Sequence, residues 1–249
     1  MKIASFKSAQ NKPLYGALNA IMAARGFKPE GEASSPEWAG WEKPVGASLL
    51  VSINISLGST LPPDTWSIDP MVIIDSRYVA EQSARLRLDR DCWRKPDDWV
   101  EPEAIQILRF LPGYLRWQDD PSLTVKVFKG RPETLQQLSD VISAVFDQYV
   151  QPVLDQMETP AGAAQFHENA IDGNLAKRGW VQPSYSATNP YVATALLWME
   201  AGCPERALAI LEGAIEQKAA IQSEFNAEYC DALFCKINKL IADLRGTDS

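Results

Sequence analysis

The chain has 249 residues, which allows one large domain or two small ones. It is 46% hydrophobic and 22% charged, so it can bury a full core and has the balance of an ordinary globular protein. The formal net charge is -8, from 24 basic and 32 acidic residues, which argues against nucleic-acid binding and permits an acidic surface that meets a basic partner.

The stretch 47–57 is the clearest strand of the sequence. Polar residues alternate there with an apolar set, which is Val51, Ile53, Ile55 and Leu57. A period of two places these apolar side chains on one face of a strand and the polar ones on the other. We therefore predict a central strand of an antiparallel sheet, with a dry face that helices must cover.

Other elements are predicted on both sides of this strand. A helix over 13–25, with Asn11 as its candidate N-cap, ends at Gly26 and covers the dry face. Further strands are predicted over 37–42, 67–75, 83–88 and 123–128, and a short helix over 103–110. The result is an antiparallel sheet of about four to five strands, with 37–42 paired to 47–57 across a turn at 44–46.

The second half of the chain has the periodicity of helices. The longest apolar stripe runs over 132–157, and Pro152 should kink that helix near 148–149 because it removes one hydrogen bond. A shorter helix after Thr159 carries His167.

Two further helices, over 190–200 and 204–218, form a hairpin around Gly202 with the spacing of part of a tetratricopeptide unit. A C-terminal helix follows from 225 to 244. Two interpretations remain open between 218 and 225: a turn near Ser223, which we favour, and one continuous helix.

Together these elements predict an α+β fold, in which an N-terminal antiparallel sheet covered by helices joins an all-helical C-terminal half with a tetratricopeptide-like hairpin. We assign residues 1–130 to the helix-plus-sheet region and residues 131–249 to the helical region packed on it. A single domain is the alternative.

The cysteine pattern bears on the cellular compartment. There is no Cys-x-x-Cys pair among the four cysteines, which are Cys92, Cys203, Cys230 and Cys235, and this favours a reducing cytoplasm over a disulfide scaffold. No apolar run is long enough to span a bilayer, and residues 8–13 are polar where a signal peptide needs an apolar core. We expect a cytoplasmic protein without membrane contact.

Several short motifs follow one another in a familiar order. A helix ends in Gly26-Phe27, an Ile-Asn-Ile strand follows, and an Arg-x-Arg-Leu stretch at 85–88 leads into a turn with Asp and Trp. A Pro-x-Leu helix end at 152–154 and a Trp-x-x-Ala-Gly hairpin at 198–202 complete the set. Over roughly residues 11–217 this order resembles a family of uncharacterised bacterial proteins classed only as a domain of unknown function. Some relatives lie beside toxin genes and look like immunity proteins, so the resemblance implies binding to a toxin and carries over no catalytic residue.

Acidic and aromatic residues gather between positions 89 and 117, together with arginine and lysine. Tryptophan beside arginine is favoured at the energetic centres of protein interfaces. The residues that we predict to contact a partner are Asp89, Asp91, Trp93, Asp97, Asp98, Trp99 and Trp117. The alternative is structural: salt bridges would engage the acids on a solvated loop, and Trp93 and Trp99 would close the open end of the sheet.

His167 is the only histidine, so a Ser–His–Asp or Cys–His site must use it, and a two-histidine metal site is excluded within one chain. Its neighbours form no known catalytic signature, and we expect a surface or half-buried histidine with a local hydrogen bond. No phosphate-cradling glycine loop occurs. We predict no catalytic residue, no metal and no cofactor.

The first function that follows is a non-catalytic protein-binding protein, most concretely an immunity- or antitoxin-like inhibitor of a basic toxin domain. Its negative charge would steer association, and burial of Trp93 or Trp99 would hold the complex.

Two alternatives stay open. One is a small hydrolase or carboxylate–metal enzyme that uses Asp89, Asp91 or Glu101. The other is a peptide-binding scaffold on the hairpin, which requires an exposed groove lined by Tyr191, Thr194 and Trp198. The oligomeric state is left undetermined by the sequence.

Overall fold

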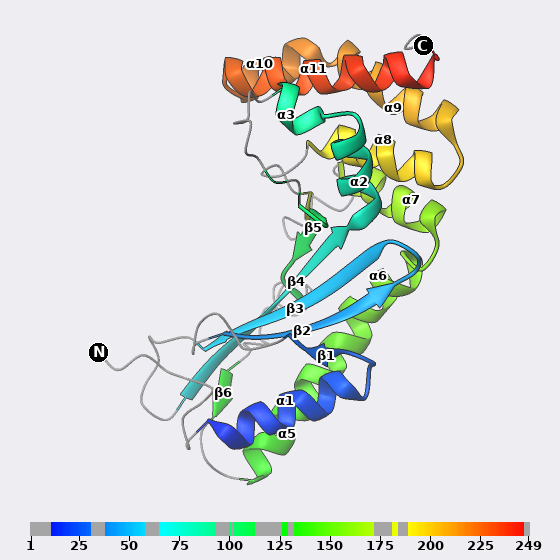
Figure 1. The fold of residues 1–249 in the computed structure, drawn as a ribbon. Helices are drawn as coiled ribbons and strands as arrows, with labels where there is room; N and C mark the ends of the chain where they lie inside the picture. The colour runs from blue at the N-terminus through cyan, green and yellow to red at the C-terminus, as the bar shows by residue number, and fades with distance from the viewer. Residues whose placement is uncertain are drawn as a thin grey trace.

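The computed structural model describes residues 11–30, 38–57, 65–92, 100, 102–112, 126–128, 132–171, 181–183 and 189–246. An antiparallel sheet in its first half and a mostly helical second half confirm the predicted α+β fold (Figure 1). The strands are β1 (Lys28–Pro29), β2 (Trp38–Val45), β3 (Leu49–Leu57), β4 (Thr65–Ser76), β5 (Ile105–Phe110), β6 (Lys126–Phe128) and β7 (Val181–Pro183). Among the described residues the sheet order is β1-β2-β3-β4-β5-β7, and β6 pairs with β4.

The helices of the first half are α1 (Lys12–Ala23), α2 (Arg77–Arg85) and α3 (Leu88–Cys92). Those of the second half are α5 (Pro132–Val145), the π-helical turn η1 (Phe146–Val150), α6 (Gln151–Gln156), α7 (Pro160–Ile171), α8 (Pro190–Glu200), α9 (Pro204–Glu216), α10 (Lys218–Glu224) and α11 (Ala227–Leu244). In Figure 1, α1 and the long helix α5–η1–α6 lie together on one side of the strands, and α3 and α8–α11 form the opposite end of the molecule.

Strand β3 has the predicted two faces. Val51, Ile53 and Ile55 are buried, with at most 1% of their surface exposed. They are aligned with apolar residues of the neighbouring strands: Ile53 pairs with Trp41 of β2 and with Val72 of β4. One cluster of buried side chains extends from this sheet into the helices of the second half. The division at residue 130 therefore remains a prediction beside the single-domain alternative.

Two predicted elements have the wrong type. Residues 83–88, predicted as a strand, form the end of α2, a turn at 86–87 and the start of α3. The reason is a helix N-cap: the Ser76 hydroxyl accepts a hydrogen bond from the Val79 amide at 3.1 Å, and the helix then buries Val79, Ala80 and Ser83 on one face. The alternation at 84, 86 and 88 is too short to distinguish a strand from two helical turns.

The stretch 103–110, predicted as a short helix, contains strand β5 instead. Ile105 and Ile107 are β-branched, and Phe110 pairs with Val72 of β4. Because Ile107 and Leu108 are both buried, apolar residues occur on both faces of this strand, and their spacing resembles that of a helix.

The remaining helix predictions are confirmed, with instructive details. The Asn11 side chain does not cap α1, but Gly26 adopts the expected positive φ of 80° after it. The π-helical turn η1 immediately precedes Pro152, where the missing amide was predicted to disturb the helix. A break at Phe225 separates α10 from α11, where the Asn226 side chain accepts a hydrogen bond from the Tyr229 amide at 2.8 Å. The single continuous helix is therefore wrong, and the chain does turn, but at 225–226, just beyond the favoured position, because Ser223 itself lies in α10.

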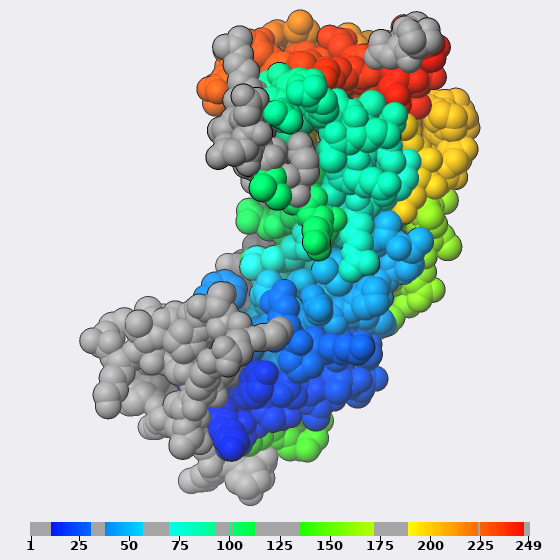
Figure 2. All heavy atoms as spheres, viewed as in Figure 1, coloured from blue at the N-terminus to red at the C-terminus, as the bar shows by residue number. Residues whose placement is uncertain are grey.

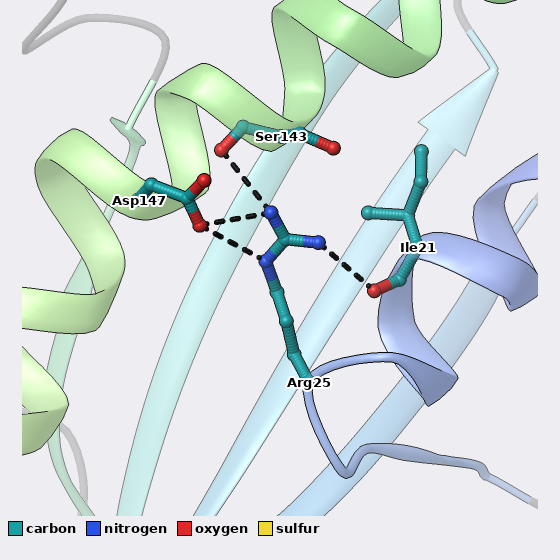
Figure 3. Close-up of polar contacts among 4 residues, drawn as sticks. All are labelled: Ile21, Arg25, Ser143 and Asp147. Carbon is teal, nitrogen blue, oxygen red and sulfur yellow. Dashed lines mark hydrogen bonds and ion pairs between the residues drawn. The ribbon is translucent and has the colours of Figure 1, made fainter.

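Arg25 joins α1 to the long helix at the π-helical turn (Figure 3). Its Nε and Nη2 donate to Asp147 Oδ1 at 3.2 and 2.8 Å, and its Nη1 donates to the Ile21 carbonyl oxygen at 3.2 Å. Nη2 also lies 3.4 Å from the Ser143 carbonyl oxygen, and the guanidinium lies over the Phe146 ring. These contacts join the C-terminal end of α1 to the long helix.

Candidate functional site

The predicted partner-binding residues are only partly placed by the structure. Asp89 and Asp91 lie in α3, whereas Trp93, Asp97, Asp98, Trp99, Glu101 and Trp117 lie outside the described residues. The structure therefore tests the environment of the first two acids only.

Asp89 and Asp91 are engaged within the chain. Asp89 Oδ1 lies 2.5 Å from Lys236 Nζ of α11, and only 9% and 2% of these side chains are exposed. Asp91 pairs with Lys239 of α11 at 2.5 Å and with Arg87 at 3.4 Å. The hydrogen bond from Lys239 lowers the pKa of Asp91. Both acids thus form salt bridges within the chain, as the structural alternative to partner binding requires.

The cysteines depart from the expectation of a chain without disulfides. Cys92, the last residue of α3, is bonded to Cys235 of α11, and the two are 143 positions apart in the sequence. Cys203 and Cys230 are free. No spacing motif indicates a bond between such distant residues, so this disulfide could not be predicted from the sequence.

His167 is completely buried, contrary to the expected surface or half-buried position. Its Nε2 donates to the Ile107 carbonyl oxygen at 2.9 Å, and its Nδ1 lies 2.7 Å from the Thr194 hydroxyl. Burial lowers the pKa of His167 to about 4, against a smaller raising effect of the Ile107 hydrogen bond. The imidazole is therefore neutral at physiological pH, and it links α7 to β5 and α8.

Glu168, the next residue of α7, is also buried, with 4% of its surface exposed. Its Oε2 accepts a hydrogen bond from the Trp198 indole at 2.7 Å, and both carboxylate oxygens accept from the Arg206 guanidinium. These bonds fasten α7 to the α8–α9 hairpin. The groove required by the scaffold hypothesis is not formed, because Thr194 and Trp198 are buried.

The face of the sheet opposite the core carries a second group of acids. We define the outer face by register as Gly40 and Glu42 of β2, Ser52 and Asn54 of β3, and Met71, Ile73 and Asp75 of β4. Glu30, at the end of β1, joins it through a backbone bond to Gly40. Figure 2 shows the surface of β2–β4, blue to cyan, at the middle of the molecule, where the outline is hollowed.

The acids of the outer face differ from those of α3. Within the described part of the chain, the carboxylates of Glu30, Glu42 and Asp75 make no hydrogen bond or ion pair. Partial burial, followed by the charge of Glu30, raises the pKa of Asp75 to about 6. A carboxylate that loses water without gaining a partner among the described residues is available to another molecule.

Gly40 makes room for part of this group. A Cβ atom at this position would collide with Glu30 Oε2 and would come within 2.9 Å of Asn54 Oδ1. The absence of a side chain therefore lets the Glu30 carboxylate and the Asn54 amide approach each other over β2. Sequence reasoning missed this site, although the polar half of the alternation at 52 and 54 already marked the face.

Among the described residues no group of three or more His, Cys, Asp and Glu side chains could hold a metal ion. No described helix is both long and apolar enough to cross a membrane. Asp89 and Asp91 do not support the carboxylate–metal hypothesis, because each of these carboxylates forms a salt bridge with a lysine.

Comparison with protein-family models, with curated proteins and with solved structures found no match for this chain. The resemblance to an uncharacterised bacterial family remains a prediction from its motifs.

Proposed function

We propose that this chain is a non-catalytic binding protein that holds another protein, with a basic surface, against the outer face of its sheet. The observation that carries the proposal is a set of carboxylates that make no hydrogen bond or ion pair among the described residues, at Glu30, Glu42 and Asp75. The net charge of -8 favours the same kind of partner, since it speeds the approach of positive charge.

The mechanism begins with electrostatic attraction and ends with pairing at Asp75. A lysine or arginine placed beside Asp75 would lower the raised pKa of this carboxyl. Binding near pH 6 would then release a proton, and affinity would fall as the pH drops below 6. The half-buried Met71 and Ile73 supply apolar contact area between the acids.

In its concrete form, the partner is a basic toxin domain and the chain acts as an immunity- or antitoxin-like inhibitor in the cytoplasm. The motif resemblance and the acidic balance support this form. The predicted residues Trp93, Asp97, Asp98, Trp99 and Trp117 would add a second contact region.

The test uses the proteins encoded on either side of the gene for this chain as binding partners, with titration calorimetry as the measurement. Glu42→Lys should weaken binding at least about tenfold, as expected for a reversed charge in an interface. Glu216→Lys is the matched control, because it makes the same charge change at an exposed residue at the end of α9 and should leave affinity unchanged.

The result also locates the contact. Equal losses of affinity for Glu42→Lys and Glu216→Lys would show that only the net charge of the chain matters. This would contradict the outer face as the binding site. A loss confined to Asp97→Lys/Asp98→Lys would move the interface to the predicted loop. Failure of both neighbouring proteins to bind would contradict the immunity role.

A further inference from the structure

The contact between α3 and α11 is held by bonds of two kinds. The Cys92–Cys235 disulfide is covalent, and the Asp89–Lys236 and Asp91–Lys239 pairs are ionic. Cys235 and Lys236 are adjacent on α11, so the disulfide and the buried ion pair act on the same turn of this helix.

We propose that the Cys92–Cys235 disulfide is a reversible redox clamp on α11. Reduction by an external dithiol breaks the Sγ–Sγ bond, and each cysteine sulfur gains one electron and one proton. The dithiol loses two electrons and two protons and becomes a disulfide. The reduced chain keeps α3 and α11 together through the ion pairs and the buried apolar residues of the two helices.

Three observations make the clamp reversible. Cys92 and Cys235 are each partly exposed, so a dithiol can reach the bond. After reduction, the ion pairs that join the same two helices, Asp89–Lys236 and Asp91–Lys239, keep these two cysteines close together. The free Cys230 is 1% exposed, so it competes poorly for a new disulfide.

Reduction changes what the α3–α11 contact depends on. The Asp91–Lys239 pair has side chains that are 35% and 36% exposed, so salt screens it. The Arg85–Asp243 pair, which joins α2 to the end of α11, is also partly exposed. In the oxidised chain the covalent bond makes these pairs dispensable. In the reduced chain the exposed pairs contribute a larger share of the docking of α11, beside its buried apolar residues, so this contact becomes more sensitive to ionic strength.

The test is hydrogen exchange of the full chain, oxidised and reduced with dithiothreitol, at low salt and at about 1 M NaCl, where the Debye length is about 3 Å. We expect the amides of α11 to exchange at least about tenfold faster in the reduced chain at high salt, with a smaller difference at low salt. The oxidised chain should show no salt effect. Peptide mapping by mass spectrometry should find Cys92 linked to Cys235 only before reduction.

Two variants serve as controls. Cys203→Ser should behave as the native chain in both redox states, because Cys203 takes no part in the bond. The double variant Cys92→Ser/Cys235→Ser should match the reduced chain with or without dithiothreitol. The proposal is overturned if the linked peptide does not form in oxidised glutathione, or if α11 exchanges equally fast in both redox states.

Discussion

Acidic groups occur in two kinds of surroundings in this protein. At the α3–α11 end and around α7, the carboxylates of Asp89 and Glu168 are buried and fully engaged by Lys236, Arg206 and Trp198. On the outer face of the sheet, Asp75 is partly buried without a hydrogen bond or ion pair among the described residues. The first kind connects helices, and the second leaves charge available to another molecule.

The difference rests on the free energy of removing charge from water. A buried carboxylate is tolerated only when a paired charge and hydrogen bonds compensate for lost hydration. Asp89 and Glu168 meet that condition inside the chain. Asp75 has no such partner in the described part of the chain, and its raised pKa is the consequence. Removing a partner from the first kind should therefore destabilise the fold, whereas neutralising the second should not.

The largest effect is expected for Lys236→Met. It leaves the Asp89 carboxylate buried without its ammonium partner, and we expect the free energy of unfolding to fall by about 3–5 kcal/mol. Urea denaturation of the oxidised protein measures this loss.

Lys239→Met, one turn along the same helix, is the matched control, and its half-exposed pair should cost at most about 1 kcal/mol. Replacing both buried partners, as Asp89→Leu/Lys236→Met, should restore most of the lost stability. Similar losses for the two single lysine variants would show that burial does not distinguish the two pairs.

The next largest effect is a loss of stability in mild acid caused by His167. Its pKa falls from 6.5 to about 4 on folding, so below pH 6.5 the unfolded chain binds a proton that the folded chain refuses. The contribution is complete above pH 6.5 and disappears as the pH falls toward 4, by up to about 3 kcal/mol.

Urea denaturation across this pH range should show that loss in the native chain, and a smaller one in His167→Gln. Since the chain contains one histidine, its imidazole signals in an NMR titration are assigned without ambiguity. An imidazole that titrates near pH 6.5 in the folded protein would show that His167 is not buried away from water.

Trp198→Phe should have a smaller effect. It keeps most of the buried ring and removes one donor to the Glu168 carboxylate, a charge-assisted bond worth about 1.5–3 kcal/mol. The control is Trp38→Phe, at a side chain that is 42% exposed, which should change stability by at most about 0.5 kcal/mol. Equal losses in thermal unfolding would mean that the Trp198 indole nitrogen contributes nothing.

The two kinds of acid also mark the limit of what the sequence could predict. The alternation around Ile53 predicted β3 because one-sided burial produces a period of two. The partner of Asp89 could not be found in this way, since Lys236 is 147 positions away. The disulfide between α3 and α11 was missed for the same reason. Local pattern predicts which face is buried, and long-range packing decides which charges meet.

The outer face required a different kind of information. Glu42 and Asp75 lie on β2 and β4, and Glu30 follows β1, so only the register of these strands places the three on one face. The errors at 83–88 and 103–110 were local, because short apolar runs fit both periods. The predicted residues from Trp93 to Trp99 and Trp117 lie outside the described residues and remain predictions.

The smallest effect is expected for Asp75→Asn, and its sign separates the two kinds of acid. Because folding raises the pKa of Asp75 from 3.8 to about 6, the folded chain holds this proton more tightly than the unfolded chain does. The stabilisation from the protonated carboxyl is present below pH 3.8 and is lost as the pH rises through 6. This is opposite in direction to the effect of His167.

Asp75→Asn carries no charge at any pH, so the variant should be slightly more stable than the native chain above pH 6 and equal to it below pH 3.8. Solvent screening of the partly exposed carboxyl keeps the gain below about 1 kcal/mol. Glu216→Gln, on exposed α9, provides the matched control and should show no such pH-dependent difference. A variant less stable than the native chain at neutral pH would mean that Asp75 has a stabilising partner after all. Its carboxylate would then be engaged within the chain, like those of Asp89 and Glu168, and this result would contradict the outer face as a binding surface.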